Sequence, residues 1–335
     1  MRRVLGLSGG ASVPSARFRV GQFAGRLEPW GVDLTHRPSR VGSYPPRAAW
    51  KRGLWLASTL IDRVPDVIAT HRYDVTLLQR EFVSTLKTLE GFTRSPRVLD
   101  VDDAIWMVER ADAAGRIASR CDRVICGNSF LAEYFSRHTR DVVVIPTAVD
   151  TARFRPWEGQ RPTTDVVIGW SGSSGGFGYL DSIDEALAQV VRERPNVRIR
   201  LVADRSRVFK GIPPDRVEFV QWTPESEADA VRTMDVGMMP LAGTEWERGK
   251  CSLKMLQYLA CGVPALVSPV GMNVEVLDAA PVGLAARNLA EWRTQLLELV
   301  DDASLRAKLG AAGPPLVESR YSWNAVAPAL ARALS

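Results

Sequence analysis

Short apolar runs alternate along the chain with longer segments whose apolar residues recur every three or four positions. In the first half these runs are Val4–Leu7, Val75–Leu78, Val98–Val101, Val124–Cys126 and Val142–Ile145. Continuous apolar runs of this length are typical of strands buried on both faces of a parallel sheet. Segments 16–27 and 128–137 lie between them and predict helices, the second capped by Asn128. We therefore predict a doubly wound α/β domain over residues 1–150.

The same rhythm restarts after residues 151–165, whose prolines and small polar residues are typical of a linker. Helices are expected at 183–194 and 226–233. The apolar runs of this half are Val166–Trp170, Val197–Val202, Val217–Gln221, Val236–Met239 and Pro264–Ser268. We predict two Rossmann-like domains facing a cleft, because ligands of such sheets bind at the carboxyl ends of the strands.

Composition agrees with two domains, since 335 residues exceed what one hydrophobic core usually supports. No apolar stretch approaches the roughly 20 residues of a membrane span. The apolar run before Gly9 is also too short for a signal peptide.

A net charge of +5 and a pI near 9.2 suit an anionic substrate or an acidic membrane surface. The number of cysteines is too small for a disulfide scaffold and favours a cytoplasmic protein, in which Cys121, Cys126, Cys251 and Cys261 serve structural packing. The three histidines are scattered along the chain, so we expect no metal site.

A glycine-rich turn follows the first strand of each predicted domain. Gly9 and Gly10 follow the first, while Gly172 and Ser173 occupy the same place in the second. A turn of this kind lets backbone N–H groups approach a phosphate closely, although a tight turn or a flexible surface loop is the simple alternative. The spacing lacks the GxGxxG pattern of an NAD site. We expect these four residues to contact an activated donor.

Cations converge on a predicted helix start near residue 253. Arg248, Lys250 and Lys254 surround it, and Gly262-Val263-Pro264 ends the helix. Cationic side chains at a helix N-terminus would neutralise a diphosphate leaving group as its charge develops. A basic, solvated helix face is the alternative interpretation.

The stretch PALVSPVGMNVEVL after KMLQYLACGV resembles the donor-binding region of retaining, nucleotide-sugar-dependent glycosyltransferases of family 4. RVICGNSFLAEYF, VVVIPTAVDTARFRP and DVGMMPL are similar to further parts of that family. The resemblance implies the GT-B architecture, with a donor-binding domain over 166–318. It also implies that residues 319–335 form a helix packing back on the N-terminal, acceptor-side domain.

The resemblance also implies roles for individual residues. Lys254 matches the lysine that holds the donor diphosphate. The loop touching the transferred sugar would be Gly271, Met272 and Asn273, closed by Glu275. The nucleobase would lie near Asp204, Gln221 and Trp222.

The sequence departs from the family where two glutamates usually frame the phosphate-binding helix. Gly249 takes the place of the first and Gln257 that of the second. Glutamine can still hydrogen-bond the ribose hydroxyls as part of the donor site, without charge assistance. Glu245 or Glu247 is a candidate substitute for the missing first carboxylate.

Carboxylates also replace the histidine that the family often carries near the reacting carbon. Asp102 and Asp103 are therefore the candidate catalytic residues, orienting an acceptor hydroxyl or stabilising oxocarbenium charge, and a helix cap is the alternative. Asp100-Val101-Asp102 also matches a metal-binding DxD signature, which we discount because the cations already serve the diphosphate. Candidate acceptor-binding residues are Arg17, Arg80 and Glu81, although a surface ion pair explains the last two equally well.

Residues 44–61 mix basic side chains with tryptophan and leucine, as an interfacial helix does. These features favour peripheral contact with the inner face of an anionic membrane, and ordinary helix packing is the alternative.

The expected function is retaining transfer of a sugar from a nucleotide-diphosphate donor to a hydroxyl of a glycan, lipid-linked saccharide or small metabolite. The alternatives are a non-catalytic sugar-nucleotide-binding protein and an epimerase or phosphorylase on the same fold. No cofactor and no nucleic-acid partner are expected.

Overall fold

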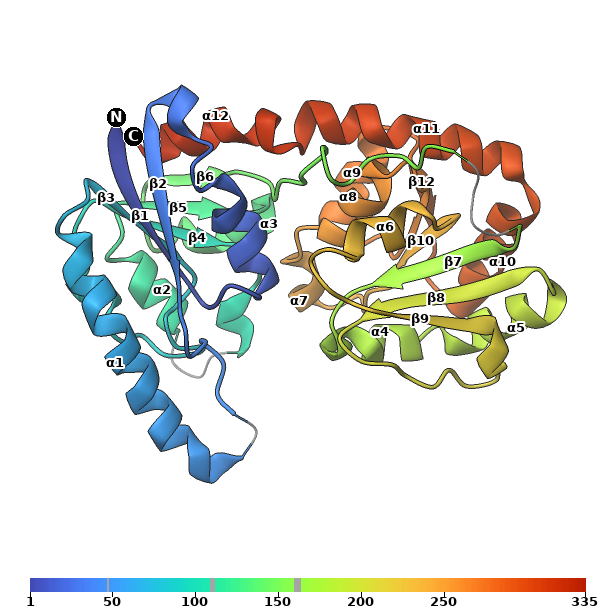
Figure 1. The fold of residues 1–335 in the computed structure, drawn as a ribbon, viewed down its shortest axis with the longest axis horizontal. Coiled ribbons are helices and arrows are strands. Elements are labelled where there is room, and N and C mark those ends of the chain that lie inside the picture. Colours follow the sequence, from blue (N-terminus) through green and yellow to red (C-terminus); the bar gives the residue numbers. More distant parts are fainter. Residues whose placement is uncertain (47, 109–111, 160–163) are drawn as a thin grey trace. The chain divides into compact units, whose positions relative to one another are not determined.

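The computed structural model describes residues 1–46, 48–108, 112–159 and 164–335, which form two compact units. Unit 1 comprises Met1–Ala148, Gly249–Cys251 and Trp323–Ser335. Unit 2 comprises Val149–Arg248 and Ser252–Ser322. Within the described residues each unit contains one six-stranded sheet whose strand pairs are all parallel (Figure 1). The α/β class predicted for both halves is confirmed.

The sheet of unit 1 has the order β2-β1-β3-β4-β5-β6. The chain leaves β1 for β2 on one side and then crosses to β3 on the other. The topological switch point therefore lies between the carboxyl ends of β1 and β3, where open α/β sheets bind ligands. The strands are β1 (Arg2–Ser8), β2 (Val32–Pro38), β3 (Val75–Gln79), β4 (Arg97–Val101), β5 (Arg123–Cys126) and β6 (Val142–Val144).

One face of this sheet is covered by the last helix of the chain and by the segment that follows β1. Val326 and Leu330 of α12 (Trp323–Ala333) share a buried cluster with Val20, Phe23 and strand residues. Figure 1 shows α1 (Arg52–Thr70) on the opposite side of the sheet from α12. The remaining helices of unit 1 are α2 (Ala113–Ala118) and α3 (Ser129–Phe135), with short 3-10 turns at Glu28–Trp30, Ala49–Lys51, Glu90–Phe92 and Ile105–Val108.

The sheet of unit 2 has the order β12-β11-β10-β7-β8-β9, so its switch point lies between β7 and β10. Its strands are β7 (Val166–Ser171), β8 (Val197–Ala203), β9 (Val217–Gln221), β10 (Val236–Met239), β11 (Ala265–Val267) and β12 (Gly283–Ala285). Its helices are α4 (Phe177–Asp181), α5 (Asp184–Glu193), α6 (Glu227–Arg232), α7 (Glu245–Arg248), α8 (Leu253–Ala260), α9 (Met272–Ala279), α10 (Leu289–Asp301) and α11 (Ala303–Arg320), with 3-10 turns at Ser174–Gly176 and Pro214–Arg216.

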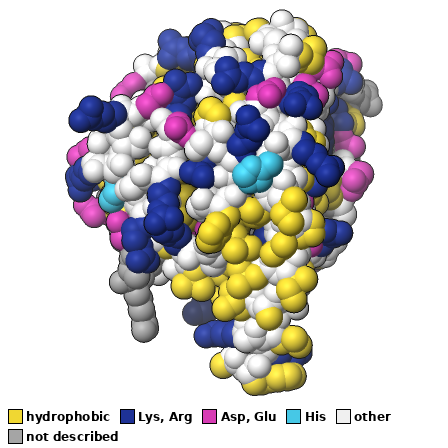
Figure 2. Space-filling view, turned by 90° about the vertical axis from the view of Figure 1, so that its left-hand side faces the viewer, with side chains coloured by type: hydrophobic (Ala, Val, Ile, Leu, Met, Phe, Trp, Pro, Cys, Tyr) yellow, Lys and Arg dark blue, Asp and Glu magenta, His cyan; other side chains and the backbone are white. Residues whose placement is uncertain are grey.

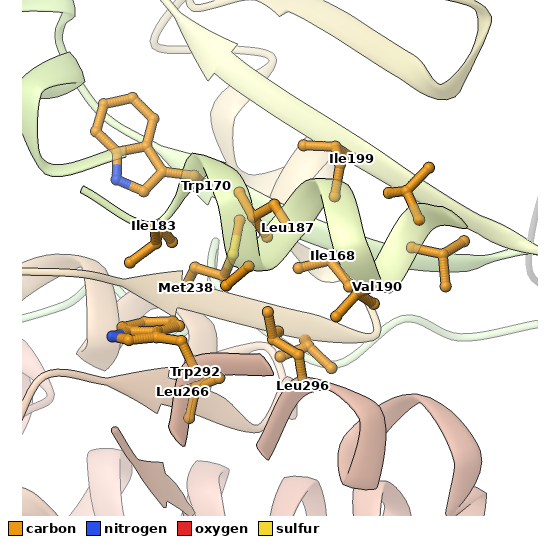
Figure 3. Close-up of a cluster of buried hydrophobic side chains, with 14 of the residues drawn as sticks. Ile168, Trp170, Ile183, Leu187, Val190, Ile199, Met238, Leu266, Trp292 and Leu296 are labelled. Carbon is orange, nitrogen blue, oxygen red and sulfur yellow. The ribbon is translucent and has the colours of Figure 1, made fainter. Parts of the chain in front are cut away.

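The core of unit 2 lies between its sheet and the helices α5 and α10. Figure 3 shows Leu187 and Val190 of α5 and Leu296 of α10 pointing toward Ile168 of β7. Trp170, also on β7, is buried at the end of this cluster nearest the strand's carboxyl terminus. The core thus fixes the strand whose end carries the second glycine turn.

All ten apolar runs form strands, but two further strands were missed. β2 was missed because Asp33, Thr35 and His36 interrupt its apolar positions, as in a sheet edge with one partly exposed face. β12 is only three residues long and also lies at an edge. The apolar-run signal was present for all central strands and for the edge strands β6 and β9, and it was absent only for the edge strands β2 and β12.

The helix predicted over 16–27 is wrong as a continuous element. The chain there forms a π-helical turn over Ala16–Val20 and a 3-10 turn over Gly21–Phe23. Gly21 and Gly25 disfavour a regular helix, and Gly25 adopts φ +68°. Helix 128–137 is confirmed as α3, where the Asn128 side chain accepts a hydrogen bond from the Leu131 amide at 3.0 Å.

The predicted linker 151–165 lies partly outside the described residues, at 160–163. Just before its described part, Val149 forms an isolated parallel bridge with Ser322 within unit 2. Residue 47, inside the predicted interfacial segment, also lies outside the described residues.

Candidate functional site

In unit 2, the glycine turn after β7 packs against Trp170 and Lys254. A Cβ atom on Gly172 would lie 2.5 Å from Cε of Lys254 and 2.7 Å from the Trp170 ring. The Gly172 amide donates to the Val202 carbonyl at 3.0 Å, which ties the turn to the end of β8. Glycine is therefore required because Lys254 and the indole occupy the space where a side chain would stand.

Lys254 lies in the first turn of α8 and its side chain is partly exposed. Its Nζ lies 5.3 Å from the centre of the Trp170 ring, within the range of a cation–π contact. The buried indole thus holds the ammonium beside the turn at the carboxyl end of β7. This arrangement matches the expected diphosphate role of Lys254 and Gly172.

Arg248 ends α7, and its side chain is 51% exposed with Glu245 at 3.9 Å. Gly271 caps the eight-residue helix α9 with φ +55° and ψ −132°, a conformation that favours glycine. A Cβ atom there would lie 2.9 Å from the Arg248 carbonyl oxygen. The α9 N-terminus and the Arg248 backbone are therefore in contact within unit 2. The N–H groups at the α9 N-terminus stabilise anions, and so does the guanidinium of Arg248.

The side chains of Met272 and Asn273 are not on the surface of this loop, contrary to the expectation of sugar contact. Asn273 is fully buried, accepts a hydrogen bond from Ser252 Oγ at 2.7 Å and donates to the Ser268 carbonyl at 3.0 Å. Its amide thereby ties the start of α8 to α9. Glu275, in the first turn of α9, is exposed as expected.

The three expected nucleobase residues lie at the ends of neighbouring strands β8 and β9. Asp204 accepts hydrogen bonds from the Ser174 amide and from Ser174 Oγ, and its carbonyl accepts one from Gln221 Nε2 at 3.2 Å. The Trp222 amide donates to the Ala203 carbonyl at 2.8 Å. Burial alone would raise the pKa of Asp204, but the Ser174 hydrogen bonds outweigh it and lower this pKa below its usual value.

Gln257 does not point toward solvent, so the expected ribose contact is not available to it. Its side chain is 2% exposed, and its Nε2 donates to Glu227 Oε1 of α6 at 3.1 Å. Glu247 is also engaged, accepting from Tyr179 Oη at 2.7 Å and from Thr244. The exposed Glu245 is therefore the better candidate for the missing carboxylate.

In unit 1, Arg80 organises the two candidate catalytic aspartates. It follows β3 in the left-handed conformation, with φ +59°. Its Nε donates to Asp102 Oδ1 at 2.7 Å, and its Nη2 lies 3.7 Å from Asp103 Oδ2. Burial would lower the pKa of Arg80, but Asp102, Tyr44 and Asp103 outweigh it and raise this pKa, so the guanidinium stays charged.

Lys250, expected beside the donor phosphate, belongs to unit 1 and joins this cluster. Its Nζ lies 3.7 Å from Asp103 Oδ2, and its carbonyl accepts a hydrogen bond from Asn128 Nδ2 at 3.2 Å. Gly249 is required because a Cβ atom would lie 2.6 Å from Cβ of Ala104. Gly249 and Lys250 therefore pack on the loop that follows β4. Burial raises the pKa of Asp103 against the opposing charges of Arg80 and Lys250.

A recess lies at the switch point of unit 1, between the ends of β1 and β3. Its lining includes Gly9, Ser43, Tyr44, Arg80 and Glu81. Within the described protein, Glu81 Oε2 and Ser43 Oγ are buried with no hydrogen-bond partner. Burial raises the pKa of Glu81 above its usual value. These two buried oxygens leave hydrogen-bonding capacity that a water molecule or a ligand hydroxyl would satisfy.

Asp100 is not available as a metal ligand of the DxD type. Its carboxylate is 1% exposed and receives Arg19 Nε at 2.9 Å and Arg19 Nη2 at 2.7 Å. Although burial lowers the pKa of Arg19, the Asp100 charge outweighs it and raises this pKa. In the described ranges, no group of three or more His, Cys, Asp or Glu side chains is arranged to hold a metal ion.

Three expected site residues lie apart from these groups. Arg17 is partly exposed, with its guanidinium 5.0 Å from the Phe18 ring, and it does not line the recess. Gly10 is buried behind the turn, and Ser173 is exposed in the second turn. Four residues that line these groups were not predicted from the sequence: Ser43, Tyr44, Trp170 and Ser174. Of these, only Ser174 could have been identified, because it lies in a glycine-rich turn.

All four cysteines are free and buried, as expected for structural packing. Of the helices that the structure describes, none combines the length and apolar character needed to cross a bilayer.

The whole chain is similar in fold to solved glycosyltransferase-type structures. The Anabaena protein HepE, in complex with UDP and glucose, superposes with a TM-score of 0.73 at 14% identity, covering 100% of this chain and 99% of that chain. Sucrose-phosphate synthase from Thermosynechococcus elongatus gives a TM-score of 0.72 at 17% identity, covering 99% and 98%. The fold is therefore that of the GT-B class, with two Rossmann-like domains.

Comparison with known protein families finds a match in the second half of the chain. Residues 173–302 match the family "Glycosyl transferases group 1". A D-inositol 3-phosphate glycosyltransferase of Segniliparus rotundus is 23% identical over 67% of this chain and 54% of its own length. The alignments with this and other curated relatives span about half the length of those proteins. The matched segment contains Lys254, Asp204 and the loop at Gly271.

Proposed function

We propose that this protein transfers a sugar from a nucleotide-diphosphate donor to a hydroxyl acceptor, with retention of the anomeric configuration. The observation that carries the proposal is the contact of Gly172, Trp170 and Lys254 at the carboxyl end of β7. It places a fixed ammonium beside a backbone turn at the switch point of unit 2. The group 1 match over residues 173–302 supports the same assignment.

The donor diphosphate would be neutralised by side chains of this protein. Lys254 and Arg248 supply positive charge, and the N-terminus of α9 after Gly271 supplies backbone dipoles. When the bond between the anomeric carbon and the phosphate oxygen breaks, its electron pair leaves with the diphosphate. The charge that develops there is stabilised by these groups. We propose that no divalent metal is needed, so transfer should persist in excess EDTA.

The acceptor is assigned to unit 1. We propose that Asp103, Arg80 and the recess with Glu81 orient its hydroxyls, since carboxylates accept hydrogen bonds from O–H groups. The proton of the attacking hydroxyl passes to Asp103 or to the departing diphosphate. The oxygen then bonds to the anomeric carbon on the face from which the diphosphate left, which retains the configuration.

The names of relatives suggest the substrate class. One is named for D-inositol 3-phosphate. Another, from Corynebacterium glutamicum, is a GDP-mannose-dependent monoacylated alpha-(1-6)-phosphatidylinositol monomannoside mannosyltransferase, 27% identical over 54% of this chain and 52% of its own length. We propose a hexose donor and a polyhydroxylated acceptor, either a cyclitol or a saccharide.

The activity test incubates the protein with UDP-hexoses and GDP-hexoses and a panel of inositol and saccharide acceptors. Nucleoside diphosphate release and the glycosylated product are measured together. Lys254→Ala should lower the rate by about 100-fold or more, the usual loss when one group that stabilises the transition state is removed. Lys308→Ala, at an exposed lysine of α11, is the matched control and should keep the rate of the wild type.

The alternatives give different results in the same assay. A non-catalytic binding protein would be stabilised by a sugar nucleotide in a thermal-shift measurement without releasing nucleoside diphosphate. An epimerase would convert the donor sugar without an acceptor, and a phosphorylase would pass the sugar to phosphate. Normal transfer by a folded Lys254→Ala protein would reject the assigned donor site.

A further inference from the structure

An apolar stripe runs along the exposed face of α1 and the turn before it. Six residues spaced three or four apart make up this α1 stripe: Trp50, Leu54, Ala57, Ile61, Val64 and Ile68. Leu54 is 76% exposed, Ile61 71% and Ile68 62%, values unusual for large aliphatic side chains. Figure 2 shows hydrophobic side chains gathered over this part of the surface. The stripe is continuous over the length of the helix.

The opposite face of α1 anchors the helix to unit 1. Arg63 is fully buried, donates to the Ser8 carbonyl and to Asp66 Oδ2, and lies 4.9 Å from the Phe82 ring. A helix with a buried arginine bound to the end of β1 is fixed to the protein by that face. The α1 stripe therefore has no role in the core and is free to contact something else.

Charges around the α1 stripe are predominantly positive. Lys51 and Arg52 are exposed at its start, and Arg72 is exposed just beyond its end. Both carboxylates of α1 are bound by arginines: Asp62 by Arg40 at 2.9 Å, and Asp66 by Arg63 at 3.2 Å. Their negative charge is thus compensated within unit 1, while the exposed cations at the two ends remain. This combination is complementary to an acidic surface.

We propose that the α1 stripe binds the surface of an anionic lipid bilayer. An apolar helix face with basic residues beside it inserts between headgroups, and the cations are attracted to the negative leaflet. Trp50 lies at the start of the stripe with Lys51 Nζ 4.9 Å from its ring, a pair suited to the headgroup level. A second copy of the chain fits less well, because the two basic surroundings would repel each other. This proposal does not depend on the proposed enzymatic activity.

Flotation with lipid vesicles tests the apolar part of the proposal. Vesicles of phosphatidylcholine mixed with phosphatidylglycerol should carry the protein, and vesicles of phosphatidylcholine alone should carry much less. The variant Leu54→Gln/Ile61→Gln should reduce the partition coefficient by about tenfold or more, since two exposed side chains lose their apolar burial. Val208→Gln, at a residue that is 88% exposed in unit 2, is the matched control and should bind normally.

Charge reversal tests the electrostatic part. Lys51→Glu/Arg52→Glu should weaken binding to the acidic vesicles, whereas Lys308→Glu should not. Failure of the wild type to float with acidic vesicles, or equal flotation of the stripe variants, would overturn the proposal. Sedimentation equilibrium provides the other decisive outcome: a dimer that Leu54→Gln/Ile61→Gln dissociates would assign the stripe to a second copy. Circular dichroism confirms that each variant is folded.

Discussion

Asp102 and Asp103 are adjacent in sequence but differ in their surroundings. Asp102 receives the Nε–H of Arg80 directly, at 2.7 Å. Asp103 Oδ1 accepts a hydrogen bond from the Ala104 amide at 3.2 Å, and its Oδ2 has two longer contacts, both 3.7 Å, to Arg80 and Lys250. Burial dominates at Asp103 and raises its pKa. Asp103 is therefore better suited to accept a proton, and Asp102 to hold Arg80 in place.

The first prediction concerns the pH dependence of transfer. A base must be deprotonated, so activity should decrease as the pH falls through the raised pKa of Asp103. Asp103→Asn should abolish this acid limb and lower kcat by roughly 100-fold to 10,000-fold. Lys250→Met removes a cation that lowers the pKa of Asp103, so the acid limb should move to higher pH. An unchanged profile of kcat against pH in both variants would show that Asp103 is not the base.

At the scale of elements, the sequence predicted central strands well and the segment after β1 poorly. Runs such as Val124–Cys126 are apolar throughout because both faces of the sheet are covered. The segment 16–27 has helical periodicity, but it is interrupted at Gly21 and Gly25, and Arg19 within it forms an ion pair with Asp100 on β4. Local periodicity contains no information about such a long-range ion pair.

This ion pair leads to a stability prediction. Arg19→Met should lower the free energy of unfolding by about 3–5 kcal/mol, because it leaves the Asp100 carboxylate buried without its partner. Replacing both residues, as Arg19→Met/Asp100→Leu, should restore part of the loss. The control is Arg3→Met, whose ion pair with Asp74 is solvent-exposed and should contribute little. Urea denaturation followed by circular dichroism measures all three, and a similar loss for Arg3→Met and Arg19→Met would contradict this account.

For the whole molecule, sequence motifs singled out candidate site residues but did not predict which of their side chains are buried. Gly172 and Asp204 follow the carboxyl ends of β7 and β8, and Lys254, in the first turn of α8, lies beside Gly172. Asn273 and Gln257 are buried, which could not be predicted because a motif gives the position of a polar residue and not its burial. Both bind other polar side chains inside unit 2 instead. These hydrogen bonds tie α8 to α9 and to α6.

The central claim is that unit 2 binds a nucleoside diphosphate through Lys254 and the turn at Gly172. Isothermal titration of UDP and GDP into this protein tests it directly, with Lys254→Ala and the control Lys308→Ala. We predict that at least one nucleotide binds to the wild type and to the control with equal affinity, and about tenfold or more weakly to Lys254→Ala, since a charged hydrogen bond contributes roughly 1.5–3 kcal/mol. Equal binding by all three proteins, or no binding of either nucleotide to the wild type, would contradict the account.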